Sequence, residues 1–233
     1  MRAYAYIDGF NLYNGAVKSR PACKWLNLRK MCERLMPADH ELAWIRYFTA
    51  RAGSSAVDPH QPQKQDIYIR ALRGECTPFS LHEGHFRTDT EWLELAGSPP
   101  DAPKRVKVRV KQEKGSDVNL AAHLIADAAE GEIDAAMIIT DDFDQEGALK
   151  MAKELYGIAL IVVSPRNQRK LSRAVGADFY KQIHESLLLE CQLPEMSLDH
   201  EGREIHRPGS WSVAPRNGEA APKDGLLPSS RSS

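Results

Sequence analysis

Two short apolar runs constrain the fold of this chain more than any other feature: "DAAMIIT" at 134–140 and "IALIVVS" at 158–164. Each run has the length of a strand and is apolar at successive positions. This is typical of strands in a parallel sheet that is covered on both faces. The segment between them, "QEGALKMAKELYG", has helical periodicity and ends at Gly157. A strand–helix–strand unit of this kind predicts an α/β fold.

Further segments extend the alternation of strands and helices over most of the chain. We therefore predict a three-layer α/β/α, Rossmann-like fold with a mainly parallel central sheet over residues 1–196. The segment 197–233 is rich in Pro, Gly and Ser, which favours a flexible tail with one docked segment near Trp211. The other predicted strands are 3–7, 42–50, 79–86, 104–111 and 177–183, and the other predicted helices are 27–36, 64–74, 116–131, one within 165–176 and one around 184–192.

Composition excludes several classes of protein. Lys and Arg total 31 against 32 Asp and Glu, so net charge does not indicate a nucleic-acid partner. The four cysteines are scattered without a CxxC pair, which disfavours a zinc site or a disulfide framework. The N-terminus does not resemble a signal peptide, and no apolar stretch reaches the roughly 18 residues of a membrane helix. We expect a cytoplasmic protein without a membrane partner; a homo-oligomer is compatible with the sequence.

Acidic residues fall where predicted strands end. Asp8 follows the first strand, while Asp141, Asp142 and Asp144 follow the buried strand that ends at Thr140. Asp117 lies in the first turn of the helix after the basic strand. Because parallel strands end at one edge of a sheet, these acids are expected to lie at one rim, where ligands bind in α/β folds. Clustered carboxylates there favour a hard cation such as Mg²⁺ or Mn²⁺.

Each acid also has a simpler interpretation. Asp8 precedes a turn with Gly9 and Asn11, and turn formation alone accounts for those residue types. Asp117 would be favourable in a first helical turn through the helix dipole, by about 0.3–1 kcal/mol. The "TDDFD" segment fits a simple cap less well, since three like charges within four residues repel one another. The joint arrangement therefore favours a metal site.

The segments "YIDGFNLY", "EKGSDVNLAAHLIADA" and "DAAMIITDDFDQEGALKMAKELYGIALIVV" resemble the NYN domain family, a branch of the PIN-like ribonucleases, over roughly residues 3–190. "ADFYKQI" and "IHRPGSW" resemble segments of its uncharacterised bacterial branch. The resemblance implies a PIN-like fold and a metal-dependent ribonuclease with Mg²⁺ or Mn²⁺ as cofactor. It implies Asp8, Asp117, Asp142 and Asp144 as catalytic metal ligands, with Asn11, Thr140 and Asp141 as supporting residues.

Local basic groups extend this expectation to RNA. Lys114 lies close to Asp117, and Arg166, Arg169, Lys170 and Arg173 follow the strand 158–164 at the same rim, where they could hold phosphates. The basic face of "KRVKVRVK" is instead interpreted as the solvated face of an edge strand, since charges protect edges from mispairing. The expected partner is RNA, in single-stranded or structured form.

The residues also bear on three other classes of function. Phe143 and Gln145 depart from the family pattern, which leaves open a non-catalytic or weakly catalytic RNA-binding adaptor on the same fold. An aspartyl phosphatase would carry a second Asp two positions after Asp8, where this chain has Phe10. A nucleotide cofactor is not expected, because the chain lacks the GxGxxG and GxxxxGK[ST] motifs.

Overall fold

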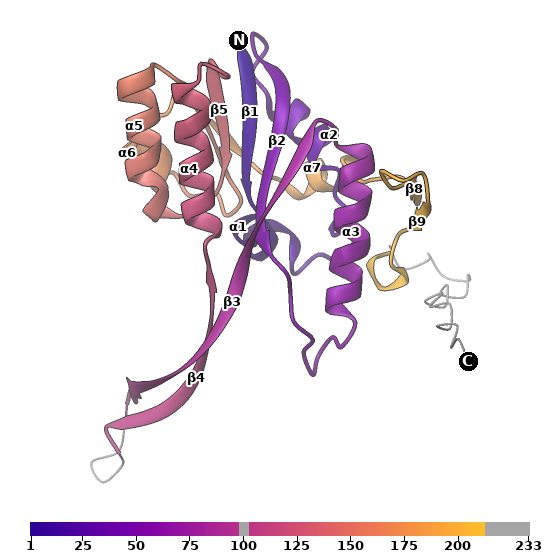
Figure 1. Ribbon diagram of the computed structural model, residues 1–233, viewed down its shortest axis with the longest axis vertical. Helices are drawn as coiled ribbons and strands as arrows, with labels where there is room; N and C mark the ends of the chain where they lie inside the picture. Colours follow the sequence, from indigo (N-terminus) through magenta and orange to yellow (C-terminus); the bar gives the residue numbers. More distant parts are fainter. Residues whose placement is uncertain (98–102, 213–233) are drawn as a thin grey trace.

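A seven-stranded sheet forms the centre of the protein, in the order β4-β3-β2-β1-β5-β6-β7 (Figure 1). The computed structural model describes residues 1–97 and 103–212. The sheet strands are β1 (Arg2–Asp8), β2 (Glu41–Ala50), β3 (Phe79–Glu94), β4 (Arg105–Lys114), β5 (Ala135–Ile139), β6 (Ala159–Ser164) and β7 (Phe179–Gln182). All neighbouring strands are parallel except β3 and β4, so the predicted mainly parallel sheet is confirmed.

Helices cover both faces of the sheet and complete the predicted three layers. One face packs against α4 (Ser116–Ala129), α5 (Glu146–Tyr156) and α6 (Lys170–Ala174). The other face packs against α1 (Gly9–Leu12), α2 (Leu28–Leu35), α3 (Gln61–Glu75) and α7 (Glu185–Glu190). The structure also contains a π-helical turn at Tyr13–Val17 and 3-10 turns at Pro21–Cys23, Phe143–Gln145 and Gly209–Trp211.

The alternation of side chains in β1 divides the core between the two faces. Ala3, Ala5 and Ile7 enter the cluster beneath α2 and α3, and Tyr4 and Tyr6 enter the cluster beneath α4 and α5. All five residues of β5 are buried, as expected for a strand covered on both sides. Within the described part of the chain, no helix is long and apolar enough to cross a membrane.

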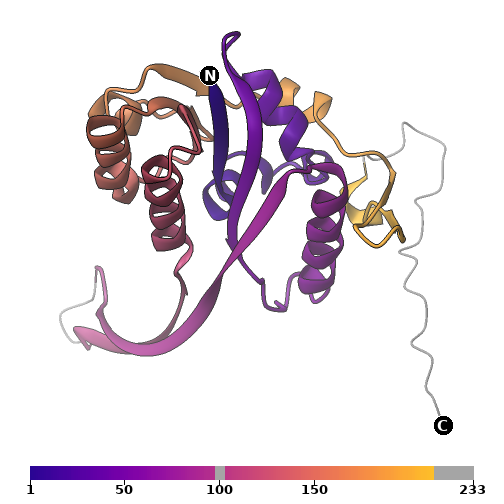
Figure 2. The same cartoon turned by 45° about the horizontal axis from the view of Figure 1, so that its top comes forward.

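The β3–β4 hairpin differs from the sequence prediction. The sequence pattern predicts that the first of its strands ends at Phe86, but β3 continues to Glu94 and pairs with β4 over its whole outer half. Figures 1 and 2 show the two strands leaving the body as a long twisted arm. Residues 87–94 are mostly polar and exposed, so their sequence lacks the apolar pattern that marks a buried strand. Antiparallel pairing with β4 holds them in the strand conformation.

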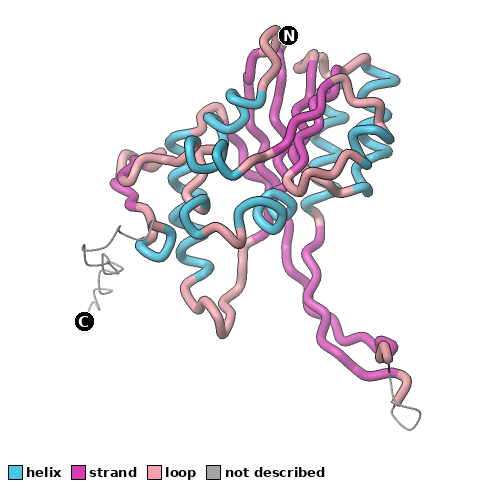
Figure 3. Tube along the Cα trace, turned by 180° about the vertical axis from the view of Figure 1, so that it is seen from behind, coloured by secondary structure: helices cyan, strands magenta, loops and turns pink. Residues whose placement is uncertain are grey.

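The boundary predicted after residue 196 also differs from the structure. β8 (Met196–Leu198) and β9 (Glu204–His206) form a hairpin that lies beside α3 (Figure 3). Ile205 is buried in the main core, and Asp199 accepts hydrogen bonds from Arg70. The segment 197–212 therefore packs onto the domain, with Trp211 against Trp25 as the predicted docked segment. The rest of the predicted tail, 213–233, lies outside the described residues.

The sequence pattern predicts that the helix ends at Gly74, but α3 does not end there. The helix continues through it to Glu75, and a Cβ at this position would lie 2.0 Å from the carbonyl oxygen of Leu198. The glycine therefore permits the close approach of β8 to the helix. The helix also begins earlier than predicted, at Gln61, with Pro62 in its first turn.

Candidate functional site

The candidate site lies where the strand order of the sheet reverses. From β1 the chain proceeds outward through β2, β3 and β4, and then returns to β5 on the other side of β1. In open α/β sheets, ligands bind at the carboxyl ends of the strands beside such a reversal. Asp8 is the last residue of β1, and Asp142 follows β5 after two further residues.

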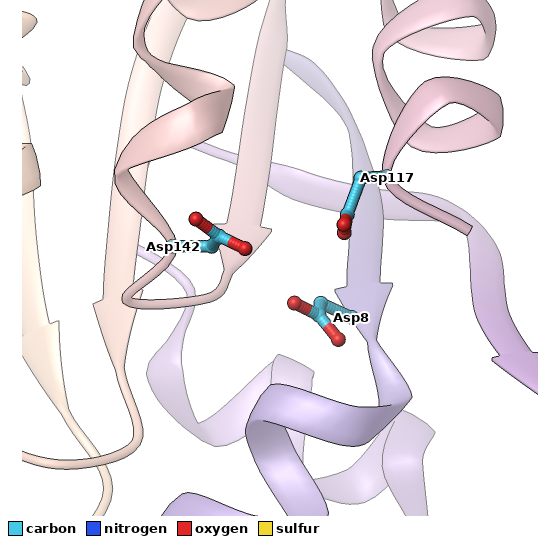
Figure 4. Close-up of side chains that lie close together, drawn as sticks. All are labelled: Asp8, Asp117 and Asp142. Atoms are coloured by element: carbon cyan, nitrogen blue, oxygen red, sulfur yellow. The ribbon is translucent and has the colours of Figure 1, made fainter. Parts of the chain in front are cut away.

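Three carboxylates from separate segments converge at this edge. Asp8, Asp117 and Asp142 each offer an oxygen, and these oxygens lie within 4.8 Å of one another. Figure 4 shows them directed into one space from the end of β1, the start of α4 and the loop after β5. The positions of these acids after strand ends and at a helix start predicted this convergence.

Asp8 is held by two hydrogen bonds. Its Oδ1 accepts from the backbone N–H of Asn11 at 2.9 Å, which caps α1, and its Oδ2 accepts from the Thr140 hydroxyl at 2.9 Å. Asp8 is 5% exposed, and burial raises the pKa of its carboxyl above the usual value, partly offset by these bonds. Asp8 thus takes part in the turn that its residue type suggests, and its carboxylate is also fixed at the rim.

Asp117 reaches the site through the turn between β4 and α4. Gly115 has φ 99°, a left-handed conformation that lets the chain leave the arm and start the helix at once. Glu113 accepts from the backbone N–H and the hydroxyl of Ser116 at 3.2 and 2.9 Å, and so secures this turn. Burial, followed by the charges of Asp8 and Asp142, raises the pKa of Asp117 to about 6.

Asp141 turns its carboxylate away from the three converging acids. It accepts hydrogen bonds from the Ser164 hydroxyl and from the Arg166 backbone N–H, the latter at 2.8 Å. Its own N–H donates to Asn11 Oδ1 at 3.1 Å, and the Arg166 guanidinium donates to the same oxygen at 3.2 Å. Asp141 and Asn11 therefore fix the loop after β6 against the site.

Asp144 lies beside the group of three without belonging to it. It is exposed, its N–H donates to Asp142 Oδ1 at 3.0 Å, and its charge contributes to the raised pKa of Asp117. Its assignment as a metal ligand stays a prediction. Thr140 is fully buried and also accepts from the Asp142 N–H at 3.1 Å, so it connects two of the carboxylates.

The predicted RNA-binding residues occupy different positions. Arg166 lines the cavity at the three acids, whereas Lys114 is exposed at the end of β4 and does not line it. Arg169 lies over the Tyr180 ring at 4.5 Å and Lys170 over the Phe143 ring at 4.4 Å. Arg173 is exposed on α6. Arg166 is thus the member of this set placed to contact a ligand in the cavity.

The cavity is open and mainly polar, with a volume of about 170 Å³. The sequence motifs do not mark three of its lining residues as site residues: Phe10, Asn14 and Glu113. Glu113 is the second-last residue of β4, whose central part alternates in polarity, and it lies four residues before Asp117, so its spacing alone does not distinguish it from an exposed strand residue. The full lining is Asp8, Phe10, Asn11, Asn14, Glu113, Asp117, Asp142 and Arg166.

The donor set fits a hard divalent cation. Oxygens on opposite sides of one Mg²⁺ lie about 4.2 Å apart, twice a metal–oxygen distance of about 2.1 Å. The three aspartate oxygens lie within 4.8 Å of one another, so a small adjustment of the side chains would bring them to that spacing. All three donors are carboxylates, the ligands that suit Mg²⁺ and Mn²⁺. Together, fold and site define an α/β protein with an acidic rim centre suited to a metal.

Comparison with known proteins gives the family of this chain. It is 30% identical over 251 residues to 6-hydroxy-3-succinoylpyridine 3-monooxygenase HspA of Pseudomonas putida, covering 92% of the chain and 77% of that enzyme. The chain belongs to the same family as HspA. No protein-family model matches it. A solved structure of a Vibrio parahaemolyticus protein of unknown function is 16% identical, with a TM-score of 0.44, over 79% of this chain and 93% of that one.

Proposed function

We propose that this protein is a metal-dependent ribonuclease that hydrolyses RNA phosphodiester bonds at Asp8, Asp117 and Asp142. The observation that carries the proposal is the convergence of these three carboxylates within 4.8 Å at the switch point of the sheet. A metal site at the rim of an open polar cavity suits a charged, hydrated substrate such as phosphate. The NYN resemblance points to the same chemistry.

The residues around the cluster have separate tasks in this proposal. A bound Mg²⁺ or Mn²⁺ would supply an activated water and neutralise charge on the phosphate. Asp8, Asp117 and Asp142 would hold the cation, while Thr140 and the Asn11 backbone keep Asp8 in place. The Arg166 guanidinium, at the cavity wall, binds a non-bridging phosphate oxygen. In the reaction, water oxygen bonds to phosphorus, one P–O ester bond breaks, and a proton passes to the leaving oxygen.

Oxygenation of an aromatic ring is a second candidate, because the chain belongs to the family of HspA, a monooxygenase by name. Sites for aromatic substrates are mainly apolar, with a few polar groups that set orientation. Here the cavity is lined by four carboxylates and one arginine, with Phe10 as its aromatic member. This lining favours a cation and a phosphate over an aromatic ring, so hydrolysis is the first proposal.

The proposal is tested with labelled single-stranded RNA and purified protein in Mn²⁺ or Mg²⁺. Cleavage should require the metal, stop in EDTA, and fall at least about 100-fold in Asp142→Asn, since one of three ligands is lost. The second candidate is tested in parallel. The protein is incubated with 6-hydroxy-3-succinoylpyridine and NADH under air, and oxygen uptake is measured. Oxygen-dependent turnover without RNA cleavage would overturn the nuclease proposal.

Two matched variants complete this test. Asp39→Asn removes an exposed acid in the loop before β2, at the opposite edge of the sheet, and should leave cleavage unchanged. Asp144→Asn determines whether the fourth predicted acid takes part: a loss comparable to Asp142→Asn assigns it to the metal site. Cleavage that persists both in EDTA and in Asp142→Asn would show a contaminating nuclease or a different site.

A further inference from the structure

We propose that one face of the β3–β4 arm is a binding track for single-stranded RNA that continues directly from the acidic cavity. This inference rests on the proposed function and extends it, because it assigns the surface that holds the substrate on either side of the cleaved bond. Figures 1 and 2 show the arm projecting from the body on the side of the sheet where α4 begins.

The strand register decides which side chains share this face. Residues paired directly across an antiparallel ladder point to the same side, and every second pair belongs to that side. We call this set the track face. Its pairs are Phe86 with Glu113, Thr88 with Lys111, Thr90 with Arg109, Trp92 with Lys107, and Glu94 with Arg105. It therefore combines two aromatic rings with four cations.

The inner end of the track face is continuous with the site. The Phe86 ring contacts the Phe10 ring edge-on at 5.6 Å between centroids, and Phe10 lines the cavity. Glu113, the partner of Phe86, also lines the cavity. The Lys111 ammonium lies 4.3 Å from the Phe86 centroid. A strand bound at the three aspartates can therefore pass over Phe10 and Phe86 onto the arm.

The outer end carries an exposed aromatic platform. Trp92 is 57% exposed, although a tryptophan in a soluble protein is usually well buried. Trp92 lies six positions after Phe86, which places it about 20 Å further along the strand. Arg105 donates to the Trp92 carbonyl at 3.0 Å and anchors the strand beneath the ring. Exposed rings set among cations are the means by which proteins bind single strands without sequence preference.

Two cations of the track face, Lys107 and Arg109, are available to a ligand. Within residues 1–97 and 103–212, neither Lys107 nor Arg109 forms an ion pair. On the opposite face of the arm, Arg87 pairs with Asp89, and Val106, Val108 and Val110 replace the cations. Cations alone would protect an exposed edge strand against mispairing. That protection does not explain why the aromatic rings and the cations share one face of the arm.

The test measures binding separately from cleavage. Full-length protein carrying Asp142→Asn is titrated in EDTA into a labelled, unstructured RNA of about 16 nucleotides. Trp92→Ala should weaken binding by about fivefold or more, the effect of losing one stacked base. Lys107→Gln with Arg109→Gln should weaken it further and reduce the slope of log K against log salt by about 1.4, two contacts at about 0.7 each. RNA should also quench tryptophan fluorescence, but not in Trp92→Ala.

The control is Lys30→Gln with Arg34→Gln, which removes two exposed cations from α2 and should leave RNA affinity unchanged. An equal loss in the control, or unchanged affinity in the arm variants, would overturn the track. Self-association that depends on Trp92, with RNA binding unaffected, would instead assign the face to a second copy of the chain.

A small activated phosphodiester separates the two proposals. Otherwise wild-type protein with Mn²⁺ should hydrolyse bis(p-nitrophenyl) phosphate equally with and without the arm substitutions, because this substrate reaches the cavity alone. Arm-dependent RNA binding without any hydrolysis would defeat the nuclease and leave the track. Hydrolysis together with arm-independent RNA binding would defeat the track and leave the nuclease.

Discussion

The hydroxyl of Thr140 donates a 2.9 Å hydrogen bond to Oδ2 of Asp8, and so joins the ends of β5 and β1 across 132 positions of sequence. Thr140 is fully buried, and its oxygen also accepts from the Asp142 backbone N–H. A single hydroxyl thus sets the relative position of two of the three converging carboxylates.

Replacing Thr140 by valine keeps the shape of the side chain and removes the hydroxyl. Asp8 Oδ2 and the Asp142 N–H then lose a partner, which should reduce the free energy of unfolding by about 1–3 kcal/mol. Metal-dependent cleavage should fall as well, because the carboxylates are no longer held in register. Urea unfolding and RNA cleavage measure the two effects. Thr140→Ser, which retains the hydroxyl, should stay closer to wild type in cleavage; equal loss in both variants would contradict this role.

Asp117→Asn should stabilise the protein in EDTA. The pKa of Asp117 is raised to about 6 by burial and by neighbouring acids, so holding it charged in the folded state costs free energy. This cost is absent below the usual pKa of 3.8, grows as pH rises, and is complete above about 6. At pH 7.5 the variant should gain on the order of 1 kcal/mol, allowing for solvent screening.

Thermal unfolding with and without Mn²⁺ checks this prediction. A bound ion stabilises the folded wild type by mass action, so its Tm should rise with Mn²⁺ concentration. Asp117→Asn should show a smaller rise, and Asp39→Asn should behave as wild type in both conditions. Destabilisation of Asp117→Asn in EDTA would mean that the three carboxylates do not repel one another as their spacing implies.

His82 should make the protein less stable in mild acid. Its ring stacks on Phe48 at 4.8 Å and lies 3.9 Å from the His123 ring. Burial, followed by the charges of His123 and Arg46, lowers the pKa of His82 to about 4, with a small opposing effect of Asp127. The unfolded chain therefore binds more protons between pH 6.5 and 4, and stability is lost as pH falls through this range.

The measurement for His82 is urea unfolding at pH 7.5 and pH 5. Wild type should lose on the order of 1 kcal/mol from this group, since the ring is only half-buried. His82→Phe preserves the stack on Phe48 and should reduce the pH dependence by that amount. His85→Phe alters an exposed histidine of the same strand and should leave the pH dependence unchanged. A pH profile identical in wild type and His82→Phe would contradict the assignment.

The centre of the fold and of the site followed from local patterns. The runs that form β5 and β6 are apolar enough to require burial on both faces, and α5 between them has clear helical periodicity. Once the sheet is parallel, Asp8 and Asp142 must share an edge, because both follow strand ends. The convergence with Asp117 follows from its place in the first turn of α4.

The remaining features depend on contacts between distant segments. The outer half of β3 forms because β4 pairs with it, and its exposed residues show no burial pattern of their own. Asp141 turns toward Ser164 on the neighbouring strand, a contact that no local motif encodes. The function of Gly74 depends on Leu198, more than 100 positions away. Such relationships are determined by packing, which single-sequence patterns do not specify.

A buried ion pair beneath the site connects α4 to the sheet and gives the last prediction. Asp127 is 3% exposed; its Oδ2 accepts from Arg46 Nε at 2.7 Å and from the Tyr6 hydroxyl at 2.6 Å.

Asp127→Ala leaves the Arg46 charge without this partner and should reduce the free energy of unfolding by about 3–5 kcal/mol. Replacing the whole group with apolar residues, as Asp127→Leu with Arg46→Met and Tyr6→Phe, should recover most of that loss in urea unfolding. If the triple variant is as unstable as Asp127→Ala, the loss is not due to the unpaired Arg46 charge, and this explanation is wrong. Because Asp127 lies ten residues along α4 from Asp117, about 15 Å away, the triple variant should retain metal-dependent cleavage below its melting temperature.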